Sequence, residues 1–329
     1  MKKKLIGFGE LLLRLDAPGH TRFSQLDGFQ AKFTGGEANV LVAANRFGIE
    51  SCLMVSSVAN NALGDACIEF LNRYGVDSDF VYRVDGRLGI LFVETGASVR
   101  PTRVVYDREF TGFRQASPAT YDWNAILKDA GILHISGTAP ALGVEVSKAI
   151  KNAISAAHQA GCLVSFDCSY RSALWSIEEA SKSYQSLAEK VDILFASPGD
   201  ARLFFGIKSD DDEDCIRGLA EQFGPKTIAF TDRVEASASQ NELTGCLLAN
   251  DQFFRSKSYR FEIVDRIGSG DAFAGGILSS IMKSKSNSET VEFATAAAVL
   301  KHTIPGDFCL AASSEVVDLM NGESLRVRR

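Results

Sequence analysis

Long apolar segments are missing from this sequence of 329 residues, and so are internal repeats and low-complexity stretches. No apolar run approaches the ~20 residues that a membrane-spanning helix requires. The chain starts with the basic residues Lys2, Lys3 and Lys4, but Glu10 and Arg14 interrupt the apolar stretch that follows, so the start does not resemble a signal peptide. We therefore expect a globular cytoplasmic protein.

Closely spaced cysteines are also missing. The seven cysteines lie far apart, their number is odd, and no two of them form a C-x-x-C motif. These spacings argue against a disulfide framework and against a zinc site, and they predict reduced thiols.

Neither sign of charge is in large excess. Lys and Arg number 35 against 41 Asp and Glu, which gives a net charge of -6. This balance argues against a nucleic acid or an anionic membrane as a partner, although a few arginines are enough to bind a small anionic substrate. With 46% hydrophobic and 23% charged residues, the composition is that of an ordinary globular protein.

From about residue 120, short apolar segments alternate with longer helical ones. This alternation is typical of β-α-β units around a parallel sheet, whose ligands bind at the carboxyl ends of the strands. We predict strands at 131–136, 163–167, 193–196 and 227–231, a later strand that ends at Val264, and helices at 143–160, 177–190, 210–223, 270–282 and 288–301.

The first part of the chain is richer in strand-like segments. It predicts strands at 5–15, 29–33, 51–58, 89–94 and 103–106, and helices at 38–48 and 64–75. We expect one large α/β core and a smaller sheet. The segments at about 10–35 and 88–112 form this smaller sheet, which interrupts the core twice, as a lid does.

The segment with the clearest chemical meaning runs from Asp265 to Gly276 and reads Asp-Arg-Ile-Gly-Ser-Gly-Asp-Ala-Phe-Ala-Gly-Gly. It follows a predicted strand and opens a predicted helix, so its small residues leave backbone N–H groups uncovered at the positive end of a helix dipole. Such a turn binds anions and suits a phosphoryl group in transfer. Asp271 lies in the first helical turn, where its carboxylate can accept the proton of an attacking hydroxyl.

Two other kinds of glycine-rich loop do not match. The segment lacks the Gly-Lys-Ser/Thr of a Walker A loop, and neither it nor 7–9 has the G-x-G-x-x-G spacing of a dinucleotide site. A purely structural role, in which Gly270 and Asp271 only cap a helix, stays open at this point. The segment 35–39, Gly-Gly-Glu-Ala-Asn, either presents amides to a polyol or forms an ordinary turn.

Together, these two glycine motifs resemble those of the ribokinase-like (PfkB) family of ATP-dependent sugar kinases, and the resemblance covers essentially the whole chain. Within this family, the likeness is strongest to kinases of 2-keto-3-deoxygluconate. It rests on four further segments: Gly-Phe-Gly-Glu at 7–10 followed by Leu-Arg-Leu at 13–15, Tyr-Asp-Arg at 106–108, Asp-Cys-Ser-Tyr-Arg-Ser-Ala-Leu-Trp at 167–175, and Leu-Lys-His-Thr-Ile-Pro-Gly-Asp at 300–307.

The resemblance implies a single kinase domain over 1–329, with a three-layer α/β core, a mostly parallel sheet and a β-sheet lid that often mediates dimerisation. It implies that ATP, with Mg²⁺, phosphorylates a primary hydroxyl of a sugar, and it leaves a monovalent cation as an open third cofactor. Asp271 then corresponds to the catalytic base, and Gly268, Ser269 and Gly270 correspond to the anion hole.

The same correspondence extends to the two substrates. Ser169 and Arg233 correspond to residues on the ATP side, and Asp200 to a residue that binds Mg²⁺ through water. Arginines suit this chemistry because a guanidinium group binds a carboxylate or a phosphate with two hydrogen bonds. The residues that correspond to sugar contacts are Gly35, Gly36, Asn39, Tyr106, Arg108, Arg171 and Asp307.

Each sugar contact also has an ordinary structural alternative. Arg108 and Arg171 are equally suited to surface ion pairs, Tyr106 to the core of the lid, and Asp307 to a turn after a Pro-Gly pair.

The sequence departs from the family pattern at four places. After Tyr-Asp-Arg it reads Glu-Phe-Thr at 109–111, where small residues are more usual. Leu91 stands where these kinases usually have a lid tyrosine, and Ser169 where they have asparagine. The Asn-x-x-Glu associated with Mg²⁺ and phosphate reads Ser-Pro-Gly-Asp at 197–200. These changes bear on the identity of the sugar and on metal affinity, whereas the turn at 265–271 is intact.

The leading hypothesis is therefore an ATP-dependent kinase that phosphorylates 2-keto-3-deoxygluconate and acts as a homodimer formed through the lid, without nucleic acid or membrane partners. The alternatives are a kinase for another sugar such as fructose, and a non-catalytic protein that binds a sugar or a nucleotide. A dinucleotide-dependent oxidoreductase is a weaker third, because the fingerprint after the first strand is missing.

Overall fold

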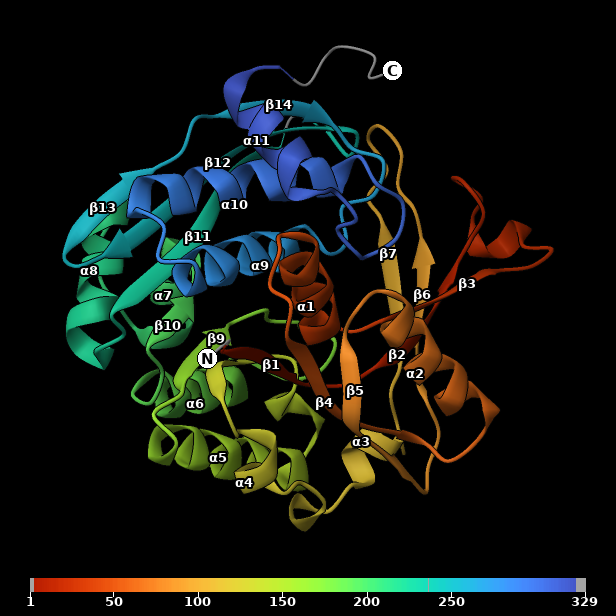
Figure 1. The fold of residues 1–329 in the computed structure, drawn as a ribbon. Helices are drawn as coiled ribbons and strands as arrows, with labels where there is room; N and C mark the ends of the chain where they lie inside the picture. Colours follow the sequence, from red (N-terminus) through yellow and green to blue (C-terminus); the bar gives the residue numbers. More distant parts are fainter. Residues whose placement is uncertain (1–2, 236, 324–329) are drawn as a thin grey trace.

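The computed structural model describes residues 3–235 and 237–323, which fold around two β-sheets of unequal size (Figure 1). The strands of the larger sheet are β1 (Lys4–Phe8), β4 (Cys52–Ala59), β5 (Asp77–Val84), β8 (Ala130–Ser136), β9 (Leu163–Asp167), β10 (Ile193–Phe195), β11 (Thr227–Glu235), β12 (Gln240–Ala249), β13 (Gln252–Arg255) and β14 (Tyr259–Glu262).

The order of the larger sheet is β13-β12-β11-β10-β9-β8-β1-β4-β5, with β14 also paired to β12. The strands from β11 to β5 run parallel, and β12, β13 and β14 are antiparallel to their neighbours. After β1 the chain first builds β4 and β5 on one side and later builds β8 to β11 on the other. The strand order therefore reverses between β1 and β8. Open α/β sheets bind their ligands at such a topological switch point.

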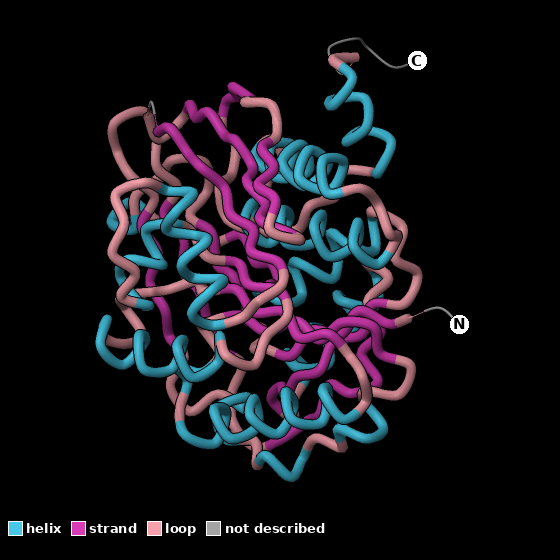
Figure 2. The backbone as a smooth tube through the Cα atoms, turned by 90° about the vertical axis from the view of Figure 1, so that its left-hand side faces the viewer, coloured by secondary structure: helices cyan, strands magenta, loops and turns pink. Residues whose placement is uncertain are grey.

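Helices cover both faces of this sheet, so the core has three layers, as Figure 2 shows from the side. One face is covered by α1 (Gly36–Arg46), α2 (Ala62–Arg73), α9 (Ser269–Met282) and α10 (Asn287–His302), and α11 (Ser313–Asn321) packs on α10. The other face is covered by α3 (Gly112–Gln115), α4 (Trp123–Ile126), α5 (Val144–Gln159), α6 (Ile177–Ala188), α7 (Pro198–Phe205) and α8 (Asp212–Phe223).

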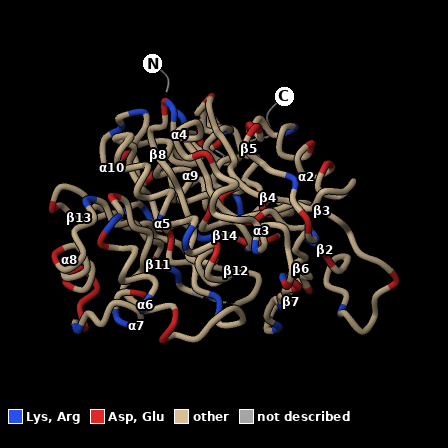
Figure 3. Tube along the Cα trace, turned by 90° about the horizontal axis from the view of Figure 1, so that it is seen from below, with Lys and Arg blue, Asp and Glu red and all other residues tan. Residues whose placement is uncertain are grey.

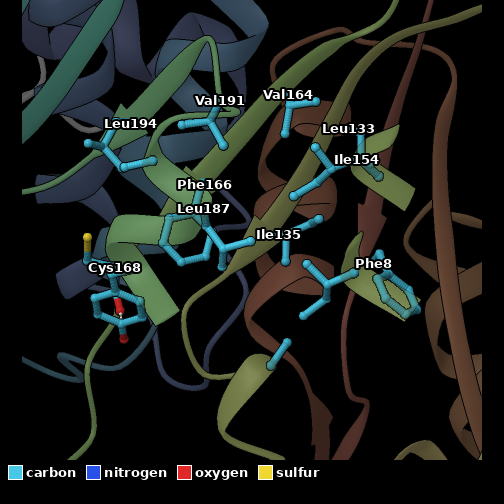
Figure 4. Packing of buried hydrophobic residues seen from close by; sticks show 14 of the residues in the cluster. Phe8, Leu133, Ile135, Ile154, Val164, Phe166, Cys168, Leu187, Val191 and Leu194 are labelled. Carbon is cyan, nitrogen blue, oxygen red and sulfur yellow. Dashed lines mark hydrogen bonds between the residues drawn. The ribbon is translucent and has the colours of Figure 1, made fainter. Parts of the chain in front are cut away.

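Alternate residues of the parallel strands supply the two buried clusters. In β1, Ile6 and Phe8 belong to the cluster under α5 and α6, whereas Leu5 belongs to the cluster under α1 and α9. Figure 4 shows the first cluster, in which Phe8 lies at one end and Leu194 at the other. Burial on both faces explains why these strands are almost continuously apolar.

The smaller sheet consists of β2 (Leu12–Asp16), β3 (Gln30–Thr34), β6 (Gly89–Glu94) and β7 (Arg103–Asp107), in the order β3-β2-β6-β7. This confirms that two separate excursions of the chain form a second sheet. The predicted strand at 5–15 is wrong, because it is two strands in two sheets. The chain leaves the core at Gly9 and Glu10, and the apolar pattern on either side hides the break.

Most other predicted elements lie within a few residues of their observed bounds. The sequence reading missed β5, β12 and β13, and it placed the end of the late strand at Val264, whereas β14 ends at Glu262. The acidic run at 210–214 forms the start of α8, where a helix was predicted at 210–223, and Asp211 is its cap. Figure 3 shows basic and acidic residues interspersed along the trace, in keeping with the small net charge.

All seven cysteines are buried and free. Within the described residues, no helix has both the length and the apolar character needed to cross a membrane.

Candidate active site

The glycine-rich turn and the start of α9 form one side of the site. Gly268 caps α9 with a φ of +85°, and a Cβ atom here would lie 2.0 Å from the backbone oxygen of Asp307, so only glycine fits. Apart from its chain neighbours and the backbone of its own helix, a Cβ atom at Gly270 would meet no described atom within 4 Å. The first turn of α9 therefore opens onto free space, as an anion site at a helix N-terminus requires.

Asp271 lies in this first turn and faces Asn39 of α1. The Asn39 amide Nδ2 donates a hydrogen bond of 2.6 Å to Oδ2 of Asp271. Burial is the main cause that raises the pKa of Asp271, to about 6. The hydrogen bond from Asn39 and the charge of Arg171 lower this pKa, and the charge of Glu37 raises it. Asp271 is therefore ionised near neutral pH and still basic enough to take a proton from a hydroxyl.

The N-terminus of α1 is tied to the end of β8. Glu37, in the first turn of α1, is buried, and its Oε1 accepts a 2.8 Å hydrogen bond from the backbone N–H of Ser136. A Cβ atom at Gly9 would lie 1.9 Å from Oε2 of Glu37, so a glycine after β1 makes room for this carboxylate. Burial raises the pKa of Glu37. This contact fixes Gly35, Gly36 and Asn39 over the carboxyl ends of β1 and β8.

Asp167 ends β9 next to the same site. Its Oδ1 accepts a 3.0 Å hydrogen bond from the backbone N–H of Ser169, which has a φ of +32°. Burial and then the charge of Asp271 raise the pKa of Asp167 to about 7, and Arg171 works in the opposite direction. Two carboxyl groups with raised pKa values thus share the neighbourhood of one guanidinium group, a combination that is frequent in active sites.

The smaller sheet supplies the opposite wall. Arg108 follows β7, is buried, and donates from Nε to Oε2 of Glu10 at 2.5 Å, and its guanidinium carbon lies 5.8 Å from the ring centroid of Tyr106. Thr111 donates to the other oxygen of Glu10. Nε of Arg108 is thereby held, and its two terminal nitrogens can bind a ligand. Leu91 lies beside Tyr106 in the register of β6 and β7.

Asp307 is bound by the protein itself. One of its carboxylate oxygens accepts from Arg14 and the other from Thr34, both of which belong to the smaller sheet. The Thr34 hydroxyl also lies 3.2 Å from Oδ1 of Asn39. A chain of polar contacts therefore runs from the smaller sheet through Asn39 to Asp271.

Of the three residues assigned to ATP and Mg²⁺, Ser169 lies beside Asp167, whereas Arg233 and Asp200 make separate contacts. Arg233, near the end of β11, donates to the hydroxyl of Ser269 at 3.4 Å. Asp200 closes the first turn of α7, where its Oδ2 accepts from the Ser197 backbone at 2.8 Å and from the Ser197 hydroxyl at 2.7 Å. Within the described residues, no three His, Cys, Asp or Glu side chains group as metal ligands.

One pocket unites most of the residues that the sequence indicated. Gly268, Ser269, Gly270, Arg233 and Asp200 do not line it, although the first three form the turn that precedes Asp271. Sequence reasoning missed Glu10, Thr34, Glu37, Ser136 and Thr138. The pocket is lined by Glu10, Leu12, Thr34, Gly35, Gly36, Glu37, Asn39, Leu91, Tyr106, Arg108, Ser136, Thr138, Ser169, Arg171, Ile267, Asp271 and Asp307.

The sequence matches the profile of the pfkB family of carbohydrate kinases over residues 2–307. The chain belongs to the pfkB carbohydrate kinases. It is thus a phosphotransferase that acts on a sugar and uses ATP, as its glycine motifs indicated.

Relatives of this pfkB kinase include enzymes of acid sugars. A 2-dehydro-3-deoxygalactonokinase from Haloferax volcanii is 30% identical over 330 residues, which cover 100% of both chains. The solved 2-dehydro-3-deoxygluconokinase of Thermotoga maritima is 37% identical, with a TM-score of 0.94 over 97% of this chain and 100% of that chain. An E. coli protein solved in complex with ATP and Mg²⁺ is 23% identical, with a TM-score of 0.84 over 97% of this chain and 99% of that one, and it shows the shared fold alone.

Proposed function

We propose that this pfkB kinase transfers the γ-phosphoryl group of ATP to the primary hydroxyl of 2-keto-3-deoxygluconate. The hydroxyl oxygen attacks the γ-phosphorus, the bond between this phosphorus and the β,γ-bridging oxygen breaks, and ADP leaves. The proton of the hydroxyl passes to Asp271. The N–H groups of Gly268, Ser269 and Gly270 stabilise the charge that develops on the transferred group.

The observation that carries this proposal is the composition of a single pocket. It combines Asp271, beside the open start of α9, with Tyr106, Arg108 and Arg171. A neutral sugar carries no anionic group that pairs with two guanidinium groups, whereas the carboxylate of an acid sugar binds them with charge-assisted hydrogen bonds. The T. maritima relative is named for this substrate. The H. volcanii relative is named for the galactonate analogue, which is therefore the second candidate acceptor.

We further propose that Mg²⁺ accompanies ATP. This ion is usually held by substrate phosphates, water and one or two carboxylates, and Asp200 offers one carboxylate. Asp200 would hold it through water at Oδ1, because Oδ2 closes α7. When bound, the ion would neutralise charge on the phosphates. Ser169 and Arg233 are proposed to face the ATP side, Arg233 beside Ser269.

The experiment is an ADP-release assay with Mg-ATP and one of four acceptors: 2-keto-3-deoxygluconate, its galactonate analogue, fructose, or none. Release that depends on an acid sugar supports the proposal, and identification of the phosphorylated product completes it. Release with fructose alone refutes the acid-sugar assignment. No release with any acceptor, from folded protein, favours the non-catalytic alternative if a thermal shift shows that a sugar or a nucleotide still binds.

Two substitutions test the assigned roles. Asp271→Asn should lower kcat by about 10²- to 10⁴-fold, the range of general-base catalysis, with the melting temperature kept. Arg108→Ala should raise KM for the acid sugar and leave KM for ATP unchanged. Arg83→Ala is the matched control, because this arginine pairs with the exposed Asp65 and does not line the pocket.

We also propose a homodimer through the smaller sheet and a cytoplasmic location. Ala31, Leu15, Phe92 and Val105 lie in one row across the four strands, on the face opposite to Arg14. Val105 is 50% exposed, and an apolar row of this kind calls for a covering surface. Light scattering should show a dimer that Val105→Asp dissociates. Free thiols at every cysteine suit a reducing compartment.

A further inference from the structure

Arg14 is a buried arginine in the smaller sheet to which neither the resemblance nor the mechanism assigned a role. Its side chain is 2% exposed, and each of its nitrogens meets a different carboxylate. Nε donates to Asp16 at 2.6 Å, one terminal nitrogen donates to Asp265 at 2.8 Å, and the other donates to Asp307.

Two of these carboxylates belong to the core and hold the glycine-rich turn. Oδ1 of Asp265 accepts from the backbone of Ile267 at 3.1 Å, and Oδ2 accepts from the backbone of Gly306 at 2.9 Å. The backbone of Asp307 packs directly on Gly268. Arg14, in the smaller sheet, thus binds Asp265 and Asp307, the two residues that hold the anion-binding turn in place.

The charges around Arg14 balance. Lys32 contacts Asp16 at 3.2 Å, and the fully buried Lys301 lies beside Asp265, whose backbone oxygen its ammonium group contacts at 3.4 Å. We call this set the charge cluster; it has three cations and three carboxylates. Only a guanidinium group has donors in three directions at fixed angles, so lysine at position 14 would keep the charge but not the three contacts. The charge cluster consists of Arg14, Asp16, Lys32, Asp265, Lys301 and Asp307.

We propose that Arg14 is a positioning residue for phosphoryl transfer. It acts through Asp265 and Asp307 to hold the turn at 265–270 in its anion-binding shape while the smaller sheet lies against the core. The anion site therefore takes its binding shape only when the smaller sheet, which carries Tyr106 and Arg108, lies against the core. This inference rests on the kinase function proposed above.

The test compares Arg14→Lys with the unaltered enzyme and with Arg83→Lys, a control in an exposed ion pair with Asp65 on the edge strand β5. Arg14→Lys should lower kcat by about 10²-fold, the loss typical of one missing donor in an anion hole. It should raise KM for ATP about tenfold, because the turn meets the phosphates, and change KM for the sugar by less than about twofold. KM values do not depend on the fraction of folded enzyme, so this split separates positioning from simple loss of stability.

Unchanged KM for ATP in Arg14→Lys, with or without a lower melting temperature, overturns the proposal. If this variant does not fold, the double substitution Arg14→Met with Asp16→Asn removes one charge of each sign and leaves the rest of the cluster balanced. This double variant should show the same rise in KM for ATP. An unchanged KM for ATP in the double variant again overturns the proposal. Failure of the kinase function itself would look different, since the unaltered enzyme would then phosphorylate no sugar.

Discussion

Replacing Asn39 by alanine should move the pH dependence of catalysis to higher pH. Oδ2 of Asp271 accepts a 2.6 Å hydrogen bond from Asn39, and this bond lowers a pKa that burial has raised to about 6. A hydrogen bond to a charged group contributes about 1.5–3 kcal/mol, or about 1–2 pKa units. Since water can enter the space left by the amide, we expect the lower end, a pKa near 7 for Asp271 in Asn39→Ala.

This shift makes the effect depend on pH. With a pKa of about 6, half of the Asp271 carboxyls are ionised at pH 6; with a pKa of about 7, about one in ten is. Relative to the unaltered enzyme, Asn39→Ala should therefore lose about fivefold more activity at pH 6 than at pH 8. At pH 8, Asp271 is almost fully ionised in both enzymes.

The measurement is kcat/KM for the sugar at saturating Mg-ATP between about pH 5 and pH 9, which reports groups of the enzyme with ATP bound and the sugar absent. Asn45→Ala is the control, because Asn45 is at the other end of α1 and contacts only backbone oxygens. Its acidic limb should coincide with that of the unaltered enzyme. An acidic limb that stays in place in Asn39→Ala would refute the assignment of Asp271 as the titrating base.

Three further predictions follow from the same geometry. Glu37→Gln should shift the acidic limb of kcat/KM to lower pH, because the charge of Glu37 raises the pKa of Asp271; an upward shift would contradict this. Gly270→Ala should lower kcat by about 10²-fold, because a methyl group enters the open space of the anion site, while the melting temperature stays the same or rises. Ser197→Ala should lower the free energy of unfolding by about 1 kcal/mol in a denaturant titration, since the hydroxyl caps α7 by accepting from the backbone of Asp200, and it should leave the acidic limb in place.

The turn at 265–271 was accessible from the sequence because its information is local. Three small residues between a strand and a helix define an anion site without reference to the rest of the chain, and Asp271 follows directly. The alternation of strands and helices after residue 120 was equally local, since strands buried on both faces read as apolar runs. The bounds of β9 coincide with those predicted.

The other half of the site depends on contacts between distant segments. Arg14 and Asp265 are 251 residues apart, and Asn39 and Asp271 are 232 apart, so no spacing rule relates them. Nothing local in the sequence indicates that Glu37 is buried; the space for its carboxylate exists because Gly9, on another element, has no Cβ atom. Asp307 was read as a sugar contact, whereas the fold directs both of its oxygens to the smaller sheet; a role with substrate stays a prediction.

The parallel pairing of β2 with β6 has a consequence for the order of folding. Leu12 lies opposite Gly89, and between them the chain must build β3, α1, β4, α2 and β5. Closing so long a loop costs entropy that local contacts do not offset, so pairings of this kind form late. The pairing of β1 with β8 in the core closes a still longer loop, since Leu5 lies opposite Ile132. Arg14 and Asp265 are 251 residues apart, so on loop length the contacts between Arg14 and the glycine-rich turn form after both of these pairings. A refolding chain should therefore acquire both sheets before its catalytic competence.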